Sequence, residues 1–119
     1  MKKLIVLICF LFILIGCGKG ETIMINKVTC NEVKELVKEG AILIDVREQD
    51  EYNQEHLDGA INISYTIIGD KISEITSDLD KKIIVYCRSG ARSNKAANTL
   101  IDKGYKNIYD LGGINNCKK

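Results

Sequence analysis

Two largely apolar segments, Ala41–Val46 and Lys81–Tyr86, constrain the fold of this chain more than any other feature of its sequence. Their apolar character is continuous rather than alternating, which is typical of a β-strand covered on both faces. Amphipathic stretches with helical spacing separate and follow them, as in the apolar positions Ala96, Ala97 and Leu100. Strands that alternate with helices predict βα units and a parallel sheet. We therefore predict an α/β fold with a central parallel sheet flanked by helices.

Shorter patterns predict the remaining elements. Thr29 and Glu32 fit a capping box, in which two side chains satisfy exposed amide groups at the start of a helix, and Gly40 ends that helix. Further strands are expected at Ile23–Ile25, Ala60–Ile63 and Asn107–Tyr109. Further helices are expected at Arg47–Tyr52, within Tyr65–Ile75, where the pattern is weak and does not define the ends, and in the segment that ends at Gly104.

The composition is that of an ordinary globular protein with a single domain. Of the 119 residues, 45% are hydrophobic and 28% are charged, so one compact core is expected. The formal net charge is +1 without a basic or acidic block, and nucleic acid is therefore not expected as a partner. The five cysteines are an odd number and lack the paired spacings of a zinc site. We therefore expect neither a metal ion nor a full disulfide framework.

The amino terminus has the features of an export signal. Its basic start is followed by the uninterrupted apolar run Leu4–Ile15, which is shorter than the roughly 20 residues that a membrane-spanning helix needs. The small residue Gly16 directly precedes Cys17, and this end of the run resembles the lipobox of bacterial lipoproteins. The resemblance implies that residues 1–16 are a signal peptide and that lipid on Cys17 holds the protein at the cell membrane, on its extracytoplasmic face.

Residues 17–21 then contain the lipidated cysteine and a short polar tether, and residues 22–119 form the folded domain. A retained membrane anchor and an ordinary cleaved signal are the alternatives. Both also place the domain outside the cytosol.

The loop after the second apolar segment carries the chemistry. It joins the carboxyl end of a predicted strand to the start of a predicted helix, where backbone amides and the helix dipole favour an anion. Cys87 begins this loop, and Arg88 and Arg92 favour its nucleophilic thiolate form. Gly90 permits the backbone to turn its amides inward, and the Ser89 hydroxyl can donate to an anion or a persulfide. The alternative is that Cys87 is a small buried side chain at the end of a strand.

Several short motifs follow one another along the chain: Leu43–Glu48, Glu51–Tyr52, His56–Ile63, Val85–Ser93, Gly104–Tyr105 and Leu111–Gly113. Together they resemble the rhodanese homology domain, from about Thr22 onward. The resemblance implies a rhodanese-like fold and a sulfurtransferase that needs no cofactor. In this family a cysteine takes a sulfane sulfur from a small anion such as thiosulfate, holds it as a persulfide, and passes it to cyanide or a thiol.

The resemblance also implies a role for individual residues. Cys87 is the nucleophile, and the persulfide and outgoing anion are cradled by the loop residues Arg88, Ser89, Gly90, Ala91 and Arg92. The two arginines screen the negative charge of the donor. Asp45 and Arg47 match a motif that we interpret as mainly structural, an ion pair near the loop. His56 is the only histidine, and we expect no acid–base role for it because the matching family position is usually structural.

Two other functions remain open. A relay module would pass sulfur from Cys87 to a thiol of a partner protein and would turn over small donors poorly. A phosphatase or an arsenate-type reductase is disfavoured, because related phosphatases have five residues between cysteine and arginine. Here four residues lie between Cys87 and Arg92, and the narrower loop suits sulfur.

The chain departs from the rhodanese pattern near its turns and its carboxyl end. Family members often carry a proline at the position of Asp58 and a tryptophan after the paired glycines, whereas this chain has no proline and no tryptophan. Two alternatives stay open for Cys117: it resolves a persulfide on Cys87 or forms a disulfide with it, or it is an exposed thiol of the tail. We expect Cys30 to be a packing or surface residue.

Overall fold

The structure, a computed structural model, describes residues 23–118 and has five parallel strands in one sheet, in the order β1-β5-β4-β2-β3. The strands are β1 (Asn26–Lys27), β2 (Ile42–Asp45), β3 (Ile61–Asn62), β4 (Lys82–Cys87) and β5 (Asn107–Gly113). The helices are α2 (Cys30–Lys38), α3 (Gln49–Gln54), α4 (Ile68–Ile75), α5 (Ala91–Asp102) and the 3-10 helix η1 (Ile114–Cys117). The predicted α/β fold with a central parallel sheet is confirmed.

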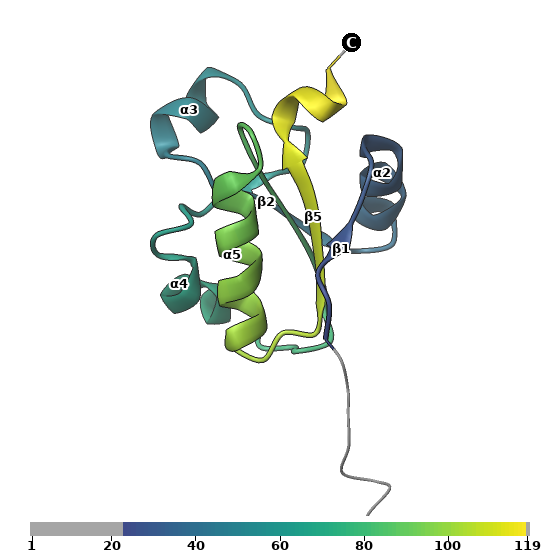
Figure 1. The fold of residues 1–119 in the computed structure, drawn as a ribbon, viewed down its shortest axis with the longest axis vertical. Coiled ribbons are helices and arrows are strands. Elements are labelled where there is room, and N and C mark those ends of the chain that lie inside the picture. The colour runs from purple at the N-terminus through teal and green to yellow at the C-terminus, as the bar shows by residue number, and fades with distance from the viewer. Residues whose placement is uncertain (1–22, 119) are drawn as a thin grey trace, which may run out of the picture.

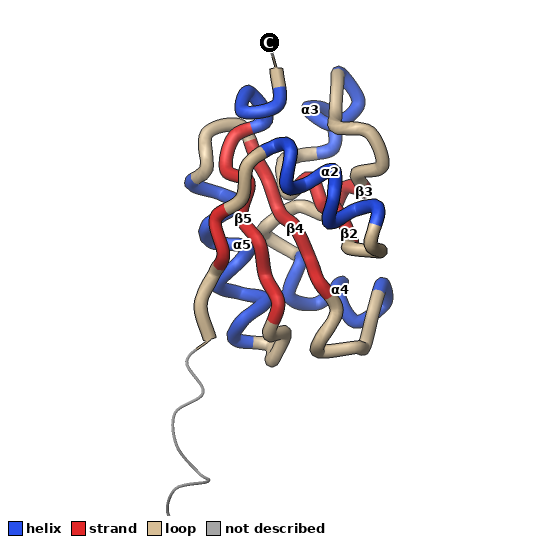
Figure 2. The backbone as a smooth tube through the Cα atoms, turned by 90° about the vertical axis from the view of Figure 1, so that its right-hand side faces the viewer, coloured by secondary structure: helices blue, strands red, loops and turns tan. Residues whose placement is uncertain are grey.

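Helices cover both faces of the sheet (Figure 1). α4 and α5 pack on one face, and α2 crosses the other face, in front of the strands in Figure 2. Along β4, Ile83 and Val85 belong to the cluster under α4 and α5, whereas Ile84 belongs to the cluster under α2. Because successive side chains of a strand point to opposite faces and both faces are buried, β2 and β4 need apolar residues at nearly every position. This is the continuous pattern seen in the sequence.

The capping box at the start of α2 is confirmed. Thr29 Oγ1 accepts a hydrogen bond from the amide of Glu32 at 3.3 Å, and Glu32 Oε1 accepts one from the amide of Thr29 at 2.8 Å. Each bond satisfies an amide that has no partner within the helix. Gly40 follows the helix with φ of 104°, a left-handed conformation that suits glycine.

Several boundaries differ from the prediction for tertiary reasons. β1 lies at Asn26–Lys27 rather than Ile23–Ile25, because these two residues pair with β5 while Ile25 packs against the core. α4 lies within the range predicted for it and begins at Ile68, because the Tyr65 amide donates to the Val46 carbonyl instead of entering a helix. α3 likewise starts two residues later than predicted, after Glu48 as its N-cap.

The carboxyl end of the chain contains more regular structure than predicted. β5 continues beyond its predicted end at Tyr109 to Gly113 and leads into η1, which the sequence did not predict. Within residues 23–118 no helix has the length and apolar character needed to cross a membrane. The predicted signal peptide, lipidated Cys17 and tether lie outside the described residues.

Candidate active site

Cys87 ends β4, and its side chain is fully buried against the first turn of α5. The backbone amides of Gly90 and Ser93 donate to Cys87 Sγ at 2.9 and 3.3 Å. Gly90 makes this arrangement possible, because it is the N-cap of α5 and has φ of 109°, in the left-handed region that residues with a Cβ atom rarely adopt. The loop therefore turns its amides toward the sulfur, as the sequence predicted.

The pKa of the Cys87 thiol is lowered. Burial raises this pKa, since a thiolate loses the stabilisation of water. Hydrogen bonds from the Ser93 side chain and from the amides of Ser93, Gly90 and Ser89 favour the thiolate and outweigh the effect of burial. The sequence predicted a stabilised thiolate from the loop amides, the helix dipole and the two arginines, and the effects that lower the pKa are hydrogen bonds within the loop. Because the thiolate is the nucleophilic form of cysteine, these hydrogen bonds favour the reactive form of Cys87.

Ser93 is a residue of the site that the sequence analysis did not single out. It is completely buried, and its hydroxyl donates to the Gly90 carbonyl at 3.0 Å. The hydroxyl has one proton, so it can turn to the sulfur only by giving up the bond to Gly90. The hydrogen bonds from the backbone amides to Cys87 Sγ therefore do not depend on the orientation of this hydroxyl. The bond from the hydroxyl to the Gly90 carbonyl stabilises the loop.

Arg88 and Arg92 converge on one carboxylate, that of Glu51 in α3. Arg92 Nη1 and Nη2 donate to Glu51 Oε1 and Oε2 at 2.8 and 3.1 Å, and Arg88 Nη2 donates to Oε2 at 3.4 Å. The hydrogen bonds from Arg92 are the main cause that lowers the pKa of Glu51 to about 2. Glu51 is therefore ionised at neutral pH, and the two arginines share its charge.

The end of β5 forms a second wall of the site. A Cβ atom on Gly113 would lie 2.4 Å from the carbonyl oxygen of Arg88, so the two segments approach this closely only because residue 113 is glycine. An open cavity of about 570 Å³ lies beside the loop. It has space for a small anion; its polar lining side chains are Lys27, Arg88, Ser89, Asp110, Asn115 and Asn116, and Cys87 is not among the residues that line it.

Asp45 and Arg47 form the predicted ion pair, and it is buried. Arg47 Nη2 donates to Asp45 Oδ2 at 2.7 Å and to the Glu55 carbonyl at 2.8 Å. The guanidinium carbon lies 5.9 Å from the centre of the Tyr86 ring. Tyr86 belongs to the cluster under α2, whereas Cys87 belongs to the cluster under α5. The pair therefore lies beside the strand end rather than against the sulfur.

The family follows from the comparison with known proteins, because residues 29–119 match the family model of the rhodanese-like domain. The chain belongs to the rhodanese family. The relative GlpE of Coxiella burnetii, named a thiosulfate sulfurtransferase, is 36% identical over 99 residues, which are 80% of this chain and 89% of the relative. PspE of Escherichia coli, which has the same enzyme name, is 37% identical over 71 residues, 60% of this chain and 68% of the relative.

A solved structure agrees with this membership. The structure described as a rhodanese with anions from E. coli is 33% identical, superposes with a TM-score of 0.63, and is matched over 66% of this chain and 93% of its own. The chain is therefore a rhodanese-type sulfurtransferase with a single rhodanese-like domain.

The rhodanese turn before β3 closes without the usual proline. The Ala60 amide donates to the Leu57 carbonyl at 3.0 Å, and Gly59 has φ of 82° at the third position of the turn. His56, in the same segment, stacks on the Tyr52 ring, and its Nδ1 lies 2.9 Å from the Tyr52 carbonyl oxygen. These contacts are structural, and the expectation that His56 has no acid–base role stays a prediction. Among residues 23–118 no group of three or more His, Cys, Asp or Glu side chains is placed to hold a metal ion.

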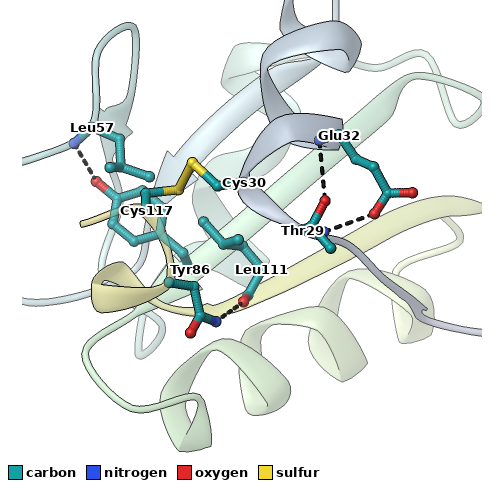
Figure 3. Close-up of a disulfide and its surroundings, with 8 residues drawn as sticks. Thr29, Cys30, Glu32, Leu57, Tyr86, Leu111 and Cys117 are labelled. Carbon is teal, nitrogen blue, oxygen red and sulfur yellow. Dashed lines mark hydrogen bonds between the residues drawn. A yellow bond between two sulfur atoms is a disulfide. The ribbon is translucent and has the colours of Figure 1, made fainter. Parts of the chain in front are cut away.

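Cys117 forms a disulfide with Cys30 (Figure 3). Neither alternative for Cys117 is therefore correct, and the expectation of a simple packing or surface role for Cys30 is wrong. Cys87 is the free cysteine of the described part of the chain. The cause is the pairing of β1 with β5: the two strands are parallel, so α2 and η1, which follow them, leave the same edge of the sheet side by side.

Proposed function

We propose that Cys87 transfers a sulfane sulfur from thiosulfate, or a related small sulfur anion, to a thiophilic acceptor such as cyanide or a thiol. The Cys87 thiolate attacks the outer sulfur of thiosulfate and forms a new S–S bond. The S–S bond of thiosulfate breaks, and sulfite leaves with the electron pair. The acceptor then attacks the outer sulfur of the Cys87 persulfide and regenerates the thiolate.

The observation that carries this proposal is the convergence of the Gly90 and Ser93 amides on Cys87 Sγ at 2.9 and 3.3 Å. Donors that stabilise a thiolate are also placed to stabilise a persulfide anion, since both carry one negative charge on sulfur. Two further facts support the donor class. The relatives in Coxiella burnetii and E. coli are named thiosulfate sulfurtransferases, and the E. coli rhodanese structure contains anions.

The test uses the full chain, purified in detergent and incubated with thiosulfate. We expect the intact mass to rise by the mass of one sulfur atom, about 32 Da, and cyanide to be converted to thiocyanate. Cys87→Ser should abolish both signals, whereas Glu74→Gln, a change of an exposed side chain on α4, should retain them. Sulfur loading with poor turnover would favour the relay function, with a partner protein as the acceptor. Turnover that survives Cys87→Ser would contradict the proposal.

We also propose that the protein is anchored by lipid on Cys17 at the extracytoplasmic face of the cell membrane. The apolar run that ends in Gly16-Cys17 supports this location. The Cys30–Cys117 disulfide supports it independently, because disulfides persist mainly in oxidising compartments outside the cytosol. Labelling of cells with radioactive palmitate should mark the wild-type chain but not Cys17→Ala. Protease added to spheroplasts or protoplasts should digest the domain. Labelling of both chains would contradict the lipid assignment.

A further inference from the structure

Glu51 contacts both loop arginines, and the proposed reaction does not use it. Its Oε1 and Oε2 accept hydrogen bonds from Arg92 at 2.8 and 3.1 Å, and Oε2 also accepts one from Arg88 at 3.4 Å. Oε1 further accepts a bond from the Glu48 amide at 3.1 Å. The side chain is 18% exposed, so the carboxylate is held in place at the rim of the site rather than lying free in solvent.

The net charge at the mouth of the site depends on this carboxylate. Arg88 and Arg92 bring two positive charges, Glu51 cancels one of them, and the Cys87 thiolate cancels the other. These four side chains together therefore offer a dianionic donor no net positive charge. A monoanionic donor is less affected, because the Coulomb energy of a ligand in a given potential is proportional to the charge of that ligand.

We propose that Glu51 determines donor specificity: by neutralising part of the charge of Arg88 and Arg92, it disfavours dianionic sulfur donors relative to monoanionic ones such as thiosulfonates. The inference rests on the proposed sulfur transfer through Cys87. Because Glu51 also holds the arginines in place, its test has to separate charge from position.

The test compares Glu51→Gln with the wild-type full chain. Glutamine keeps an oxygen that accepts a hydrogen bond from Arg92 but removes the charge. We would measure kcat/KM for thiosulfate, which carries two negative charges, and for methanethiosulfonate, which carries one, with cyanide as the acceptor. If kcat/KM for thiosulfate rises about tenfold, the same change in potential raises that for methanethiosulfonate about threefold. The ratio of the two then rises about threefold, and it rises less at high salt.

Two further variants separate charge from position. Glu51→Gln combined with Arg88→Gln restores the original net charge, so the donor ratio should return to the wild-type value even if both donors react more slowly. Glu74→Gln is the matched control, because Glu74 is an exposed carboxylate on α4 that pairs with Lys71. It changes the total charge by the same amount and should leave the ratio unchanged.

The outcomes are distinguishable. If Glu51→Gln changes both donors by the same factor, or lowers the ratio, Glu51 acts by position alone and the inference is wrong. If this variant does not fold, Glu51→Asp provides the test, because it keeps the charge and shortens the side chain: the ratio should stay at the wild-type value, and a changed ratio would contradict the inference. A wild-type chain that transfers sulfur from neither donor would instead contradict the proposed function.

Discussion

Removal of the Cys30–Cys117 disulfide is expected to lower the free energy of unfolding by about 4.6 kcal/mol. The bond joins residues 87 positions apart, with Cα atoms 5.2 Å from each other. In the loop-closure model, a cross-link over a loop of this length removes about 15 cal/mol/K of entropy from the unfolded chain, which gives the stated value at 25 °C. The Cα separation lies within the range usual for disulfides, so the folded backbone accommodates the bond without rearrangement.

The variant Cys30→Ser/Cys117→Ser tests this magnitude. Unfolding in urea, followed by far-UV circular dichroism, gives the free energy of each chain by linear extrapolation. A domain of this size has about 5–15 kcal/mol in total, so the loss is a large part of its stability, and the midpoint temperature should fall by roughly 20–35 °C. A reductant should destabilise the wild type by the same amount and should leave the double variant unchanged. Cys87→Ser is the control, because it removes a thiol without breaking the bond.

One result would refute this reasoning directly. If the double variant lies within about 1 kcal/mol of the oxidised wild type, the bond does not restrict the unfolded chain as the loop-closure model requires. Peptide mapping without reductant provides the independent check. It should find Cys30 linked to Cys117, and a link from Cys117 to Cys87 would contradict the structure.

Three further predictions follow from single residues. The rate of Cys87 alkylation by iodoacetamide should reach half its maximum at a pH below 9.0, the ordinary pKa of the thiol; a midpoint at or above that value would contradict the stabilised thiolate. The pKa of Glu51 is lowered from 4.5 to about 2, so its stabilising effect is fully present above pH 4.5 and is lost as the pH falls toward 2. Urea midpoints of Glu51→Gln should therefore fall less steeply than those of the wild type over this interval, and parallel curves would be evidence against the ion pair. Asp45→Asn should cost about 3–5 kcal/mol in urea unfolding, because it leaves Arg47 buried without a counter-charge; a cost below about 1 kcal/mol would show that the pair is dispensable.

Much of the fold was accessible from local patterns. The continuous apolar runs predicted β2 and β4, because a strand that is buried on both faces has no exposed position at which a polar residue would alternate with an apolar one. The capping box at Thr29 and the strand–loop–helix order around Cys87 involve residues within a few positions of one another, so their physical consequences can be worked out from the sequence. The candidate nucleophile was predicted in the same way.

Contacts between distant segments were not accessible. Glu51 in α3 reaches Arg92 in α5, 41 positions away, and no local pattern marks this pair. The close approach of Gly113 to the Arg88 carbonyl also depends on how β5 lies beside β4. Glu51 belongs to one of the motifs of the rhodanese resemblance, Glu51–Tyr52, but that motif does not assign it to the arginines.

By itself, the sequence determined the class of fold, the order of strands and helices, and the cysteine loop, since these depend on periodicity, caps and turns within short segments. The tertiary structure alone decided which side chains meet. It placed β1 beside β5 and so brought Cys30 to Cys117, and it brought the Glu51 carboxylate of α3 to Arg88 and Arg92. The physical reason is that ion pairs, hydrogen bonds and disulfides form only between atoms that are close in space. For residues far apart in the chain, these distances are set only by the packing of the sheet and its helices.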